Sequence, residues 1–134
     1  MRALFDVNVL ISGLLARTGA PARLLEKWLE GEFELVVTEH LLGELETTLA
    51  RPKLRRQLDD AEVSGFLELL RGLTECVEDP DTRPIVTSRD PEDDYLIAAA
   101  ASAHATLVTG DAHLLELQNS IPVLTPRAFL DSLS

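Results

Sequence analysis

The sequence is poor in cysteine and in aromatic residues. Its 134 residues include one cysteine, Cys76, one tryptophan and one tyrosine, and aromatic side chains make up 4%. A single cysteine cannot form a disulfide within the chain, so the fold must depend on an apolar core, which is compatible with a reducing cytosol. The small number of aromatic rings also limits the stacking of nucleic-acid bases on the protein surface.

Positive charge is also scarce. The chain has 12 Lys and Arg against 23 Asp and Glu, a formal net charge of −11, which excludes a protein that coats nucleic acid with a basic surface. Residues 57–97 alone hold 12 acidic and 3 basic side chains. Four cations cluster at Arg51, Lys53, Arg55 and Arg56. Such a cluster is typical either of a solvated helix end or of a patch that contacts phosphate.

Long hydrophobic runs are missing. No segment reaches the ~18 apolar residues of a membrane-spanning helix. The first 16 residues resemble a signal peptide, but Asp6 and Asn8 interrupt the apolar stretch and no A-x-A cleavage site follows. Apolar residues make up 46%, which excludes disorder. We therefore expect a single cytoplasmic domain over residues 1–134, with no membrane partner.

Short apolar segments alternate with helical patterns along the chain. Strands are expected at 2–7, 34–38, 105–109 and 121–124, with a further short strand near Ile85 or at 76–77. Helices are expected at 21–31, at 38–50 after a Thr38 cap, and after Asp60, Asp90-Pro91 and Thr125-Pro126. This alternation predicts an α/β fold with a mainly parallel sheet of four to five strands.

Acidic residues follow two of the expected strands, where open α/β sheets bind their ligands. Asp6 lies in an apolar run, where a carboxylate costs several kcal/mol unless it is paired or binds a cation. Asn8 is a turn or cap residue, or hydrogen-bonds Asp6 or a water beside a metal. Asp111 follows the strand at 105–109 and either caps a short helix from Ala112 or belongs to the same site.

Two expected helices carry further candidate carboxylates. Asp94 shares a face with alanines, which lets a helix approach a sheet closely, whereas Asp93 lies in a first turn that favours negative charge. Glu44 and Glu46 lie just outside opposite edges of one apolar stripe, so helical spacing alone does not choose between them.

Carboxylates that converge raise each other's pKa unless a cation neutralises them. An all-oxygen set suits Mg²⁺ or Mn²⁺ better than zinc, and His40, His104 and His113 form no H-x-x-x-H pair. Such an ion has a natural task in hydrolysing phosphodiesters, because it activates water and neutralises charge on the phosphate.

Four motifs, F-D-V-N, T-E-H-L-L-G-E-L, D-D-Y-L-I-A-A-A and L-V-T-G-D, follow one another in this order. Together they resemble the PIN-domain family, and A-R-P-K-L with R-D-P-E-D-D resemble its small prokaryotic members that act as toxins of toxin–antitoxin pairs. The resemblance implies a three-layer α/β/α sandwich with a central parallel sheet. It also implies a Mg²⁺- or Mn²⁺-dependent endoribonuclease that acts on RNA, an antitoxin protein as partner and a homodimer.

The resemblance also implies roles for single residues. Its acidic positions, which bind the metal and carry out catalysis, fall on Asp6, Glu44, Asp94 and Asp111, with Asp93 as the alternative to Asp94. Asn8 matches a small polar position of the site. The cluster Arg51, Lys53, Arg55 and Arg56 becomes a candidate contact for the RNA backbone.

Two other functions remain open from the sequence. F-D-V-N-V and T-G-D also resemble a phosphatase of the haloacid-dehalogenase type, but Asn8 stands where its second Asp is needed and no lysine follows Lys53. A non-catalytic PIN-like binding module is the other alternative, and a metal titration separates it from an enzyme.

Overall fold

A single parallel sheet organises the chain in the computed structural model, which describes residues 1–81, 84 and 86–133. Its strands are β1 (Arg2–Phe5), β2 (Glu34–Thr38), β3 (Glu75–Val77), β4 (Thr106–Val108) and β5 (Val123–Leu124). Their order is β3-β2-β1-β4-β5, and every neighbouring pair is parallel. The predicted α/β class and parallel sheet are confirmed. Residues 76–77 lie in β3, and Ile85 lies outside the described residues.

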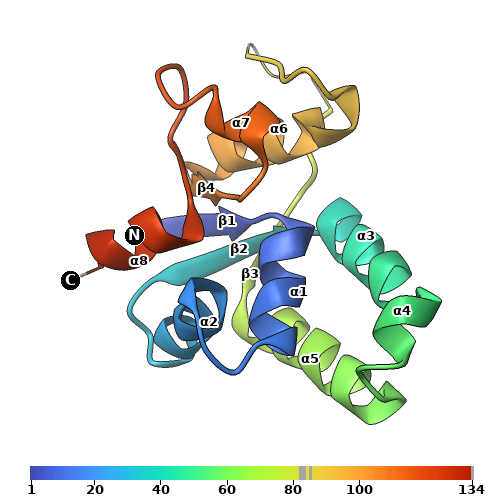
Figure 1. The fold of residues 1–134 in the computed structure, drawn as a ribbon. Coiled ribbons are helices and arrows are strands. Elements are labelled where there is room, and N and C mark those ends of the chain that lie inside the picture. The colour runs from blue at the N-terminus through green and yellow to red at the C-terminus, as the bar shows by residue number, and fades with distance from the viewer. Residues whose placement is uncertain (82–83, 85, 134) are drawn as a thin grey trace.

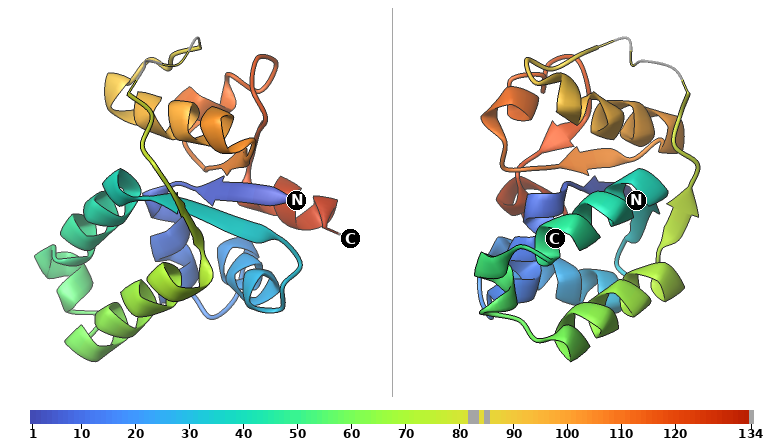
Figure 2. Two further views of the ribbon diagram at one scale, coloured as in Figure 1. Left: turned by 180° about the vertical axis from the view of Figure 1, so that it is seen from behind. Right: turned by 90° about the vertical axis from the view of Figure 1, so that its right-hand side faces the viewer.

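Helices cover both faces of this sheet. They are α1 (Val7–Leu15), α2 (Ala20–Leu29), α3 (Glu39–Leu49), α4 (Pro52–Arg55), α5 (Asp60–Leu73), α6 (Asp94–Ala103), α7 (Ala112–Leu115) and α8 (Pro126–Ser132). Figures 1 and 2 show α6 and α7 on one face and α1, α2, α3 and α5 on the other. This gives the three-layer α/β/α arrangement. Within the described ranges, no helix has the length and apolar character needed to cross a bilayer.

The core lies on both faces of the central strands. Leu35, Val36 and Val37 of β2 and Leu107 and Val108 of β4 are at most 1% exposed, as expected for parallel strands covered by helices on both sides. Burial of this kind fixes the strand ends rigidly. The residues that follow β1 and β4 are therefore held in defined positions next to each other.

The N-terminal strand is shorter than predicted. The expected strand at 2–7 ends at Phe5, and Val7 already belongs to helix α1, which the sequence did not predict. Asp6 ends the strand because its carboxylate caps the helix, accepting hydrogen bonds from the backbone N–H groups of Asn8 and Val9. Val7, Val9, Leu10 and Ile11 of this helix are buried, and the helix packs on α2 and α3 instead of continuing β1.

The segment before α6 differs from a simple helix start. Asp90 accepts a hydrogen bond from the Glu92 N–H, which confirms the predicted cap, and Pro91 occupies the first helical position. However, Pro91–Asp93 forms a single 3₁₀ turn, and the α-helix begins only at Asp94. A 3₁₀ turn advances by about 120° per residue instead of about 100°, so it changes which side chains face the sheet.

Candidate active site

Asp6 is the only buried carboxylate among the described residues. Its backbone N–H donates to the Val108 carbonyl at 3.1 Å, which ties the ends of β1 and β4 together. Its side chain is 6% exposed and accepts hydrogen bonds from the backbone of Asn8 (2.8 Å) and Val9 (3.1 Å) and from the Thr109 hydroxyl. Burial nevertheless raises the pKa of Asp6, because these three bonds offset only part of the cost of desolvating the charge.

Thr109 connects the two strand ends chemically. Its buried hydroxyl donates to Asp6 and accepts a hydrogen bond from the Asp111 N–H at 3.0 Å. Asp111 in turn caps α7 through the His113 N–H at 2.8 Å, so the predicted cap is present. Sequence reasoning missed Thr109. Thr109 is the first residue of T-G-D and directly follows β4, and this position was the available signal.

Asp93 lies close enough to Asp111 for the Asp111 carboxylate to disfavour ionisation of the Asp93 carboxyl group. Desolvation raises the pKa of Asp93 to about 7, and the hydrogen bond and charge of Asp111 contribute next. The charges of Asp90 and Asp6 act in the same direction. Asp6, Asp93 and Asp111 therefore form one electrostatic group, which we call the acidic cluster.

Asp94 makes different contacts from those of Asp93. Its Oδ1 accepts a hydrogen bond from the Ser88 N–H at 2.9 Å, and the side chain lines a neighbouring pocket with His40 and Tyr95. The sequence favoured Asp94 as the third acidic residue and kept Asp93 as its alternative. The structure brings Asp93 to Asp111, because the 3₁₀ turn before α6 rotates Asp93 toward the strand ends.

Glu44 reaches the site from α3. Its carboxylate is exposed and accepts a hydrogen bond from the Tyr95 hydroxyl at the start of α6. Burial raises the pKa of Tyr95, followed by the bond to Glu44, and the charges of Asp6 and Asp93 add to the rise. Tyr95 is thus bonded to Glu44 and lies within electrostatic reach of Asp6 and Asp93. Tyr95 was missed by sequence reasoning, although it directly follows the acidic pair in D-D-Y.

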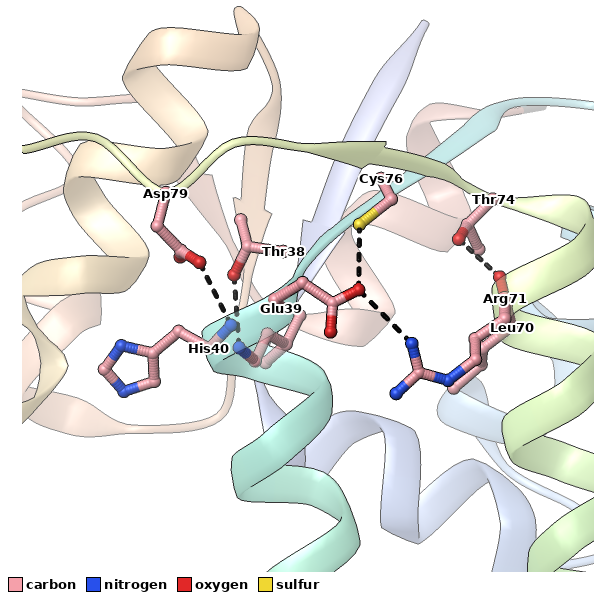
Figure 3. Close-up of polar contacts among 9 residues, drawn as sticks. Thr38, Glu39, His40, Leu70, Arg71, Thr74, Cys76 and Asp79 are labelled. Carbon is pink, nitrogen blue, oxygen red and sulfur yellow. Dashed lines mark hydrogen bonds and ion pairs between the residues drawn. The ribbon is translucent and has the colours of Figure 1, made fainter.

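The start of α3 is held from two directions (Figure 3). The Thr38 hydroxyl accepts a hydrogen bond from the Leu41 N–H at 3.1 Å, and Asp79 accepts one from the His40 N–H at 3.0 Å. Because Asp79 follows β3, this bond connects the edge of the sheet to the helix that carries Glu44. The His40 ring stacks on Tyr95 with 3.8 Å between ring centroids and 3° between planes.

The other predicted residues lie at the margin of the site or outside it. Asn8 is exposed in the first turn of α1, and its backbone N–H makes the contact with Asp6. The basic cluster surrounds α4, at the end of α3 that lies farther from α6 (Figure 1). Within it, Arg55 forms an ion pair with Asp60 at 3.0 Å. The structure therefore does not bring the basic cluster together with the carboxylates.

A comparison with protein families decides the classification. A family model described as PIN domain matches residues 2–113. The chain belongs to the PIN domain family. PIN domains are generally nucleases. A curated relative, the uncharacterized protein MJ1680 of Methanocaldococcus jannaschii, is 26% identical over 143 residues, which cover 98% of this chain and 90% of that protein.

Solved structures share the fold of this PIN domain. PAE2754 from Pyrobaculum aerophilum gives a TM-score of 0.65 at 18% identity, covering 99% of this chain and 89% of that one. VapBC2 from Rickettsia felis, bound to a promoter DNA fragment, gives 0.61 at 14% identity, and FitAcB from Neisseria gonorrhoeae gives 0.59 at 19%. Both comparisons cover 93% of this chain and 98% of the other.

The donor set of this PIN domain fits a hard divalent cation. As the side chains stand, no group of three or more His, Cys, Asp or Glu residues within the described ranges is arranged around a common point for a metal. However, the acidic cluster offers only oxygen donors, which Mg²⁺ and Mn²⁺ prefer. The charges of Asp111 and Asp6 disfavour the ionised form of Asp93, and a bound cation would offset this repulsion.

Proposed function

We propose that this PIN domain is a Mg²⁺- or Mn²⁺-dependent endoribonuclease that acts as the toxin of a toxin–antitoxin pair. The observation that carries the proposal is the acidic cluster. Asp6 and Asp111 follow the neighbouring strands β1 and β4, and their charges disfavour ionisation of Asp93. The carboxyl ends of parallel strands are where α/β folds bind ligands, and a carboxylate pair that needs a cation is suited to phosphate chemistry.

Asp6, Asp93 and Asp111 are the residues that would hold the metal. When bound, Mg²⁺ or Mn²⁺ supplies positive charge that activates water and stabilises the negative charge developing on a phosphodiester. Asp6 is suited to be a rigid ligand of the metal, since hydrogen bonds from the Asn8 and Val9 backbone and from Thr109 hold its carboxylate in place. Asp93 is suited to adjust because it is only partly buried, whereas Asp111 is held by its bonds to the His113 N–H and the Thr109 hydroxyl.

Glu44 is suited to orient the attacking water, because it is a carboxylate on the exposed side of the site. Its hydrogen bond from Tyr95 fixes the side chain, which would otherwise rotate freely on α3. Thr109 acts through Asp6 and Asp111 by holding both in place. Asn8 contributes its backbone N–H to Asp6. Arg51, Lys53, Arg55 and Arg56 are proposed to contact RNA phosphates away from the bond that is cut.

Two proteins of the same fold support the proposal of a toxin role. VapBC2 was solved with promoter DNA, and FitAcB also shares this architecture. By analogy with such pairs, we propose an antitoxin protein as partner, a homodimer as the working form and the cytoplasm as its location. If the protein is a toxin, its expression alone arrests growth of the host, and the variant Asp6→Asn relieves the arrest.

The test of the nuclease is cleavage of single-stranded RNA by purified protein with Mn²⁺, Mg²⁺ or EDTA. Asp6→Asn, Asp93→Asn and Glu44→Gln should each lower the rate at least about a hundredfold. Glu46→Gln is the matched control for Glu44, since it lies on the same helix, and should leave the rate within about twofold. Far-UV circular dichroism confirms folding of each variant. Full activity in EDTA, or in both Asp6→Asn and Asp93→Asn, would contradict the proposal.

A further inference from the structure

A pocket lies beside the acidic cluster, between the start of α3 and the start of α6. Its volume is about 520 Å³, within the range of small-ligand sites. The side chains used below are those of His40, Asp79, Asp94 and Tyr95. The pocket adjoins the site already described, because Tyr95 also bonds to Glu44 and Asp94 directly follows Asp93.

One wall of this pocket is aromatic. His40 and Tyr95 are parallel at 3.8 Å, the geometry of two stacked rings. Tyr95 is half-buried and held by Glu44, whereas the His40 side chain is exposed and its backbone is fixed by Asp79. A third planar ring can therefore add to the outer face of His40 without moving the helices. Nucleobases stack on aromatic and His side chains in this way in single-stranded RNA recognition.

The polar wall offers hydrogen-bond acceptors. Oδ2 of Asp79 accepts the His40 N–H, while Oδ1 is buried and receives no hydrogen bond from any residue in the described part of the chain. Oδ1 of Asp94 is taken by the Ser88 N–H, which leaves its other oxygen for a ligand. Ionised carboxylates only accept hydrogen bonds, so the ligand must donate.

We propose that this pocket binds a nucleobase that carries an exocyclic amino group, stacked on His40. The inference rests on the proposed ribonuclease function for its biological meaning. In that function, the pocket determines which base is preferred next to the phosphodiester bond that is cleaved. Adenine, cytosine and guanine each present an amino group to Asp79 or Asp94. Uracil presents a single N–H between two carbonyl oxygens, which the carboxylates repel. The acidic lining thus discriminates against uracil.

Binding is tested without cleavage, by NMR of the His ring protons in the metal-free protein with adenosine, cytidine and uridine. His104 and His113 are internal controls, because neither ring lines the pocket. Adenosine and cytidine should shift the His40 signals at concentrations at least about tenfold below uridine, and leave the other two rings unmoved. Because no RNA is cut, this result stands or falls separately from the nuclease assay.

The variant Asp79→Asn sharpens the test. Its amide oxygen can still accept the His40 N–H, while its NH₂ group replaces the free acceptor with a donor. The preference for cytidine over uridine should fall at least about fivefold or reverse. Glu78→Gln is the matched control, since it removes the neighbouring carboxylate outside the pocket, and should keep the wild-type preference.

Three outcomes would overturn the proposal. The first is equal binding of uridine and cytidine, and the second is the absence of any His40 shift with all nucleosides. The third is tighter binding of N-acetylarginine amide than of adenosine or cytidine, which would assign the pocket to an arginine of a partner protein. An active nuclease with any of these results refutes the pocket alone, whereas an inactive protein with the expected shifts refutes the nuclease alone.

Discussion

Replacing Asp93 by Asn tests which of two adjacent carboxylates belongs to the acidic cluster. In the metal-free protein, burial and then Asp111 raise the pKa of Asp93 from 3.8 to about 7. Between these pH values the folded protein binds more protons than the unfolded chain. The protonated carboxyl therefore stabilises the fold near pH 4, and this stabilisation is lost as the pH rises to about 7.

The magnitude follows from the size of the pKa shift. At about 1.4 kcal/mol per pKa unit, a rise from 3.8 to about 7 corresponds to at most about 4 kcal/mol. Asp93 is only partly buried, so solvent screening reduces the expected effect to about 1–2 kcal/mol. Asn is neutral at every pH and its amide can donate to Asp111. Asp93→Asn should therefore be about 1–2 kcal/mol more stable than wild type at pH 8 in EDTA, and close to wild type near pH 4.

Urea unfolding at pH 4 to 8 measures this directly, with Trp28 as the probe. It is the only tryptophan in the chain and is 5% exposed, so unfolding changes its fluorescence. Asp94→Asn is the matched control and should keep the wild-type slope of stability against pH, because Asp94 bonds to Ser88 instead. The assignment of Asp93 to the acidic cluster would be refuted if Asp93→Asn kept the wild-type dependence of stability on pH, or if Asp94→Asn lost it.

Three further predictions concern the metal, the strand ends and the helix packing. In a thermal-shift assay, Mn²⁺ at about a hundred times its Kd should stabilise the wild-type protein by about 3 kcal/mol. Asp111→Asn should abolish this stabilisation, and an equal stabilisation of that variant would contradict the metal site. Thr109→Val should lower the free energy of unfolding in urea by about 1–3 kcal/mol, because Asp6 Oδ2 and the Asp111 N–H lose their partner. Thr109→Ser keeps the hydroxyl and should retain most of the stability. Gly13→Ala should lower the free energy of unfolding by about 1–3 kcal/mol, since a Cβ there would lie 2.6 Å from Leu25 Cδ1. Gly43→Ala on α3 places its Cβ in open space and should raise the free energy of unfolding by up to about 1 kcal/mol.

The sequence predicted most of the architecture because strand and helix signals were strong. Thr38 and Thr125 cap the helices that the sequence assigned to them, and the strand at 34–38 is reproduced. Helix α1 was missed because its apolar residues follow the strand directly. Nothing in hydrophobicity alone shows that the Asp6 carboxylate ends one element and begins the next. The predicted Asp60 cap is displaced by one residue, since Asp59 forms a capping box with Glu62.

The site was predictable in composition but not in orientation. Asp6 and Asp111 followed from their positions after strands, whereas Asp93 and Asp94 are adjacent and differ only in direction. A change from 3₁₀ to α-helix at residue 94 decides that direction, and helical periodicity assumes no such change. Glu44 and Glu46 were equivalent on the helical wheel. The family resemblance selects Glu44, and in the structure Glu44 accepts a hydrogen bond from Tyr95, 51 positions away in sequence.

The pairing of β1 with β4 has a consequence during protein synthesis. Asp6 and Thr109 are 103 positions apart, yet one hydroxyl joins them. A nascent chain therefore carries Asp6 for most of its translation without the neighbours that complete the acidic cluster. The long-range contact forms only after the ribosome has passed β4. A cell producing this protein meets no assembled cluster on unfinished chains, which confines any hydrolytic activity to molecules whose synthesis has reached that strand.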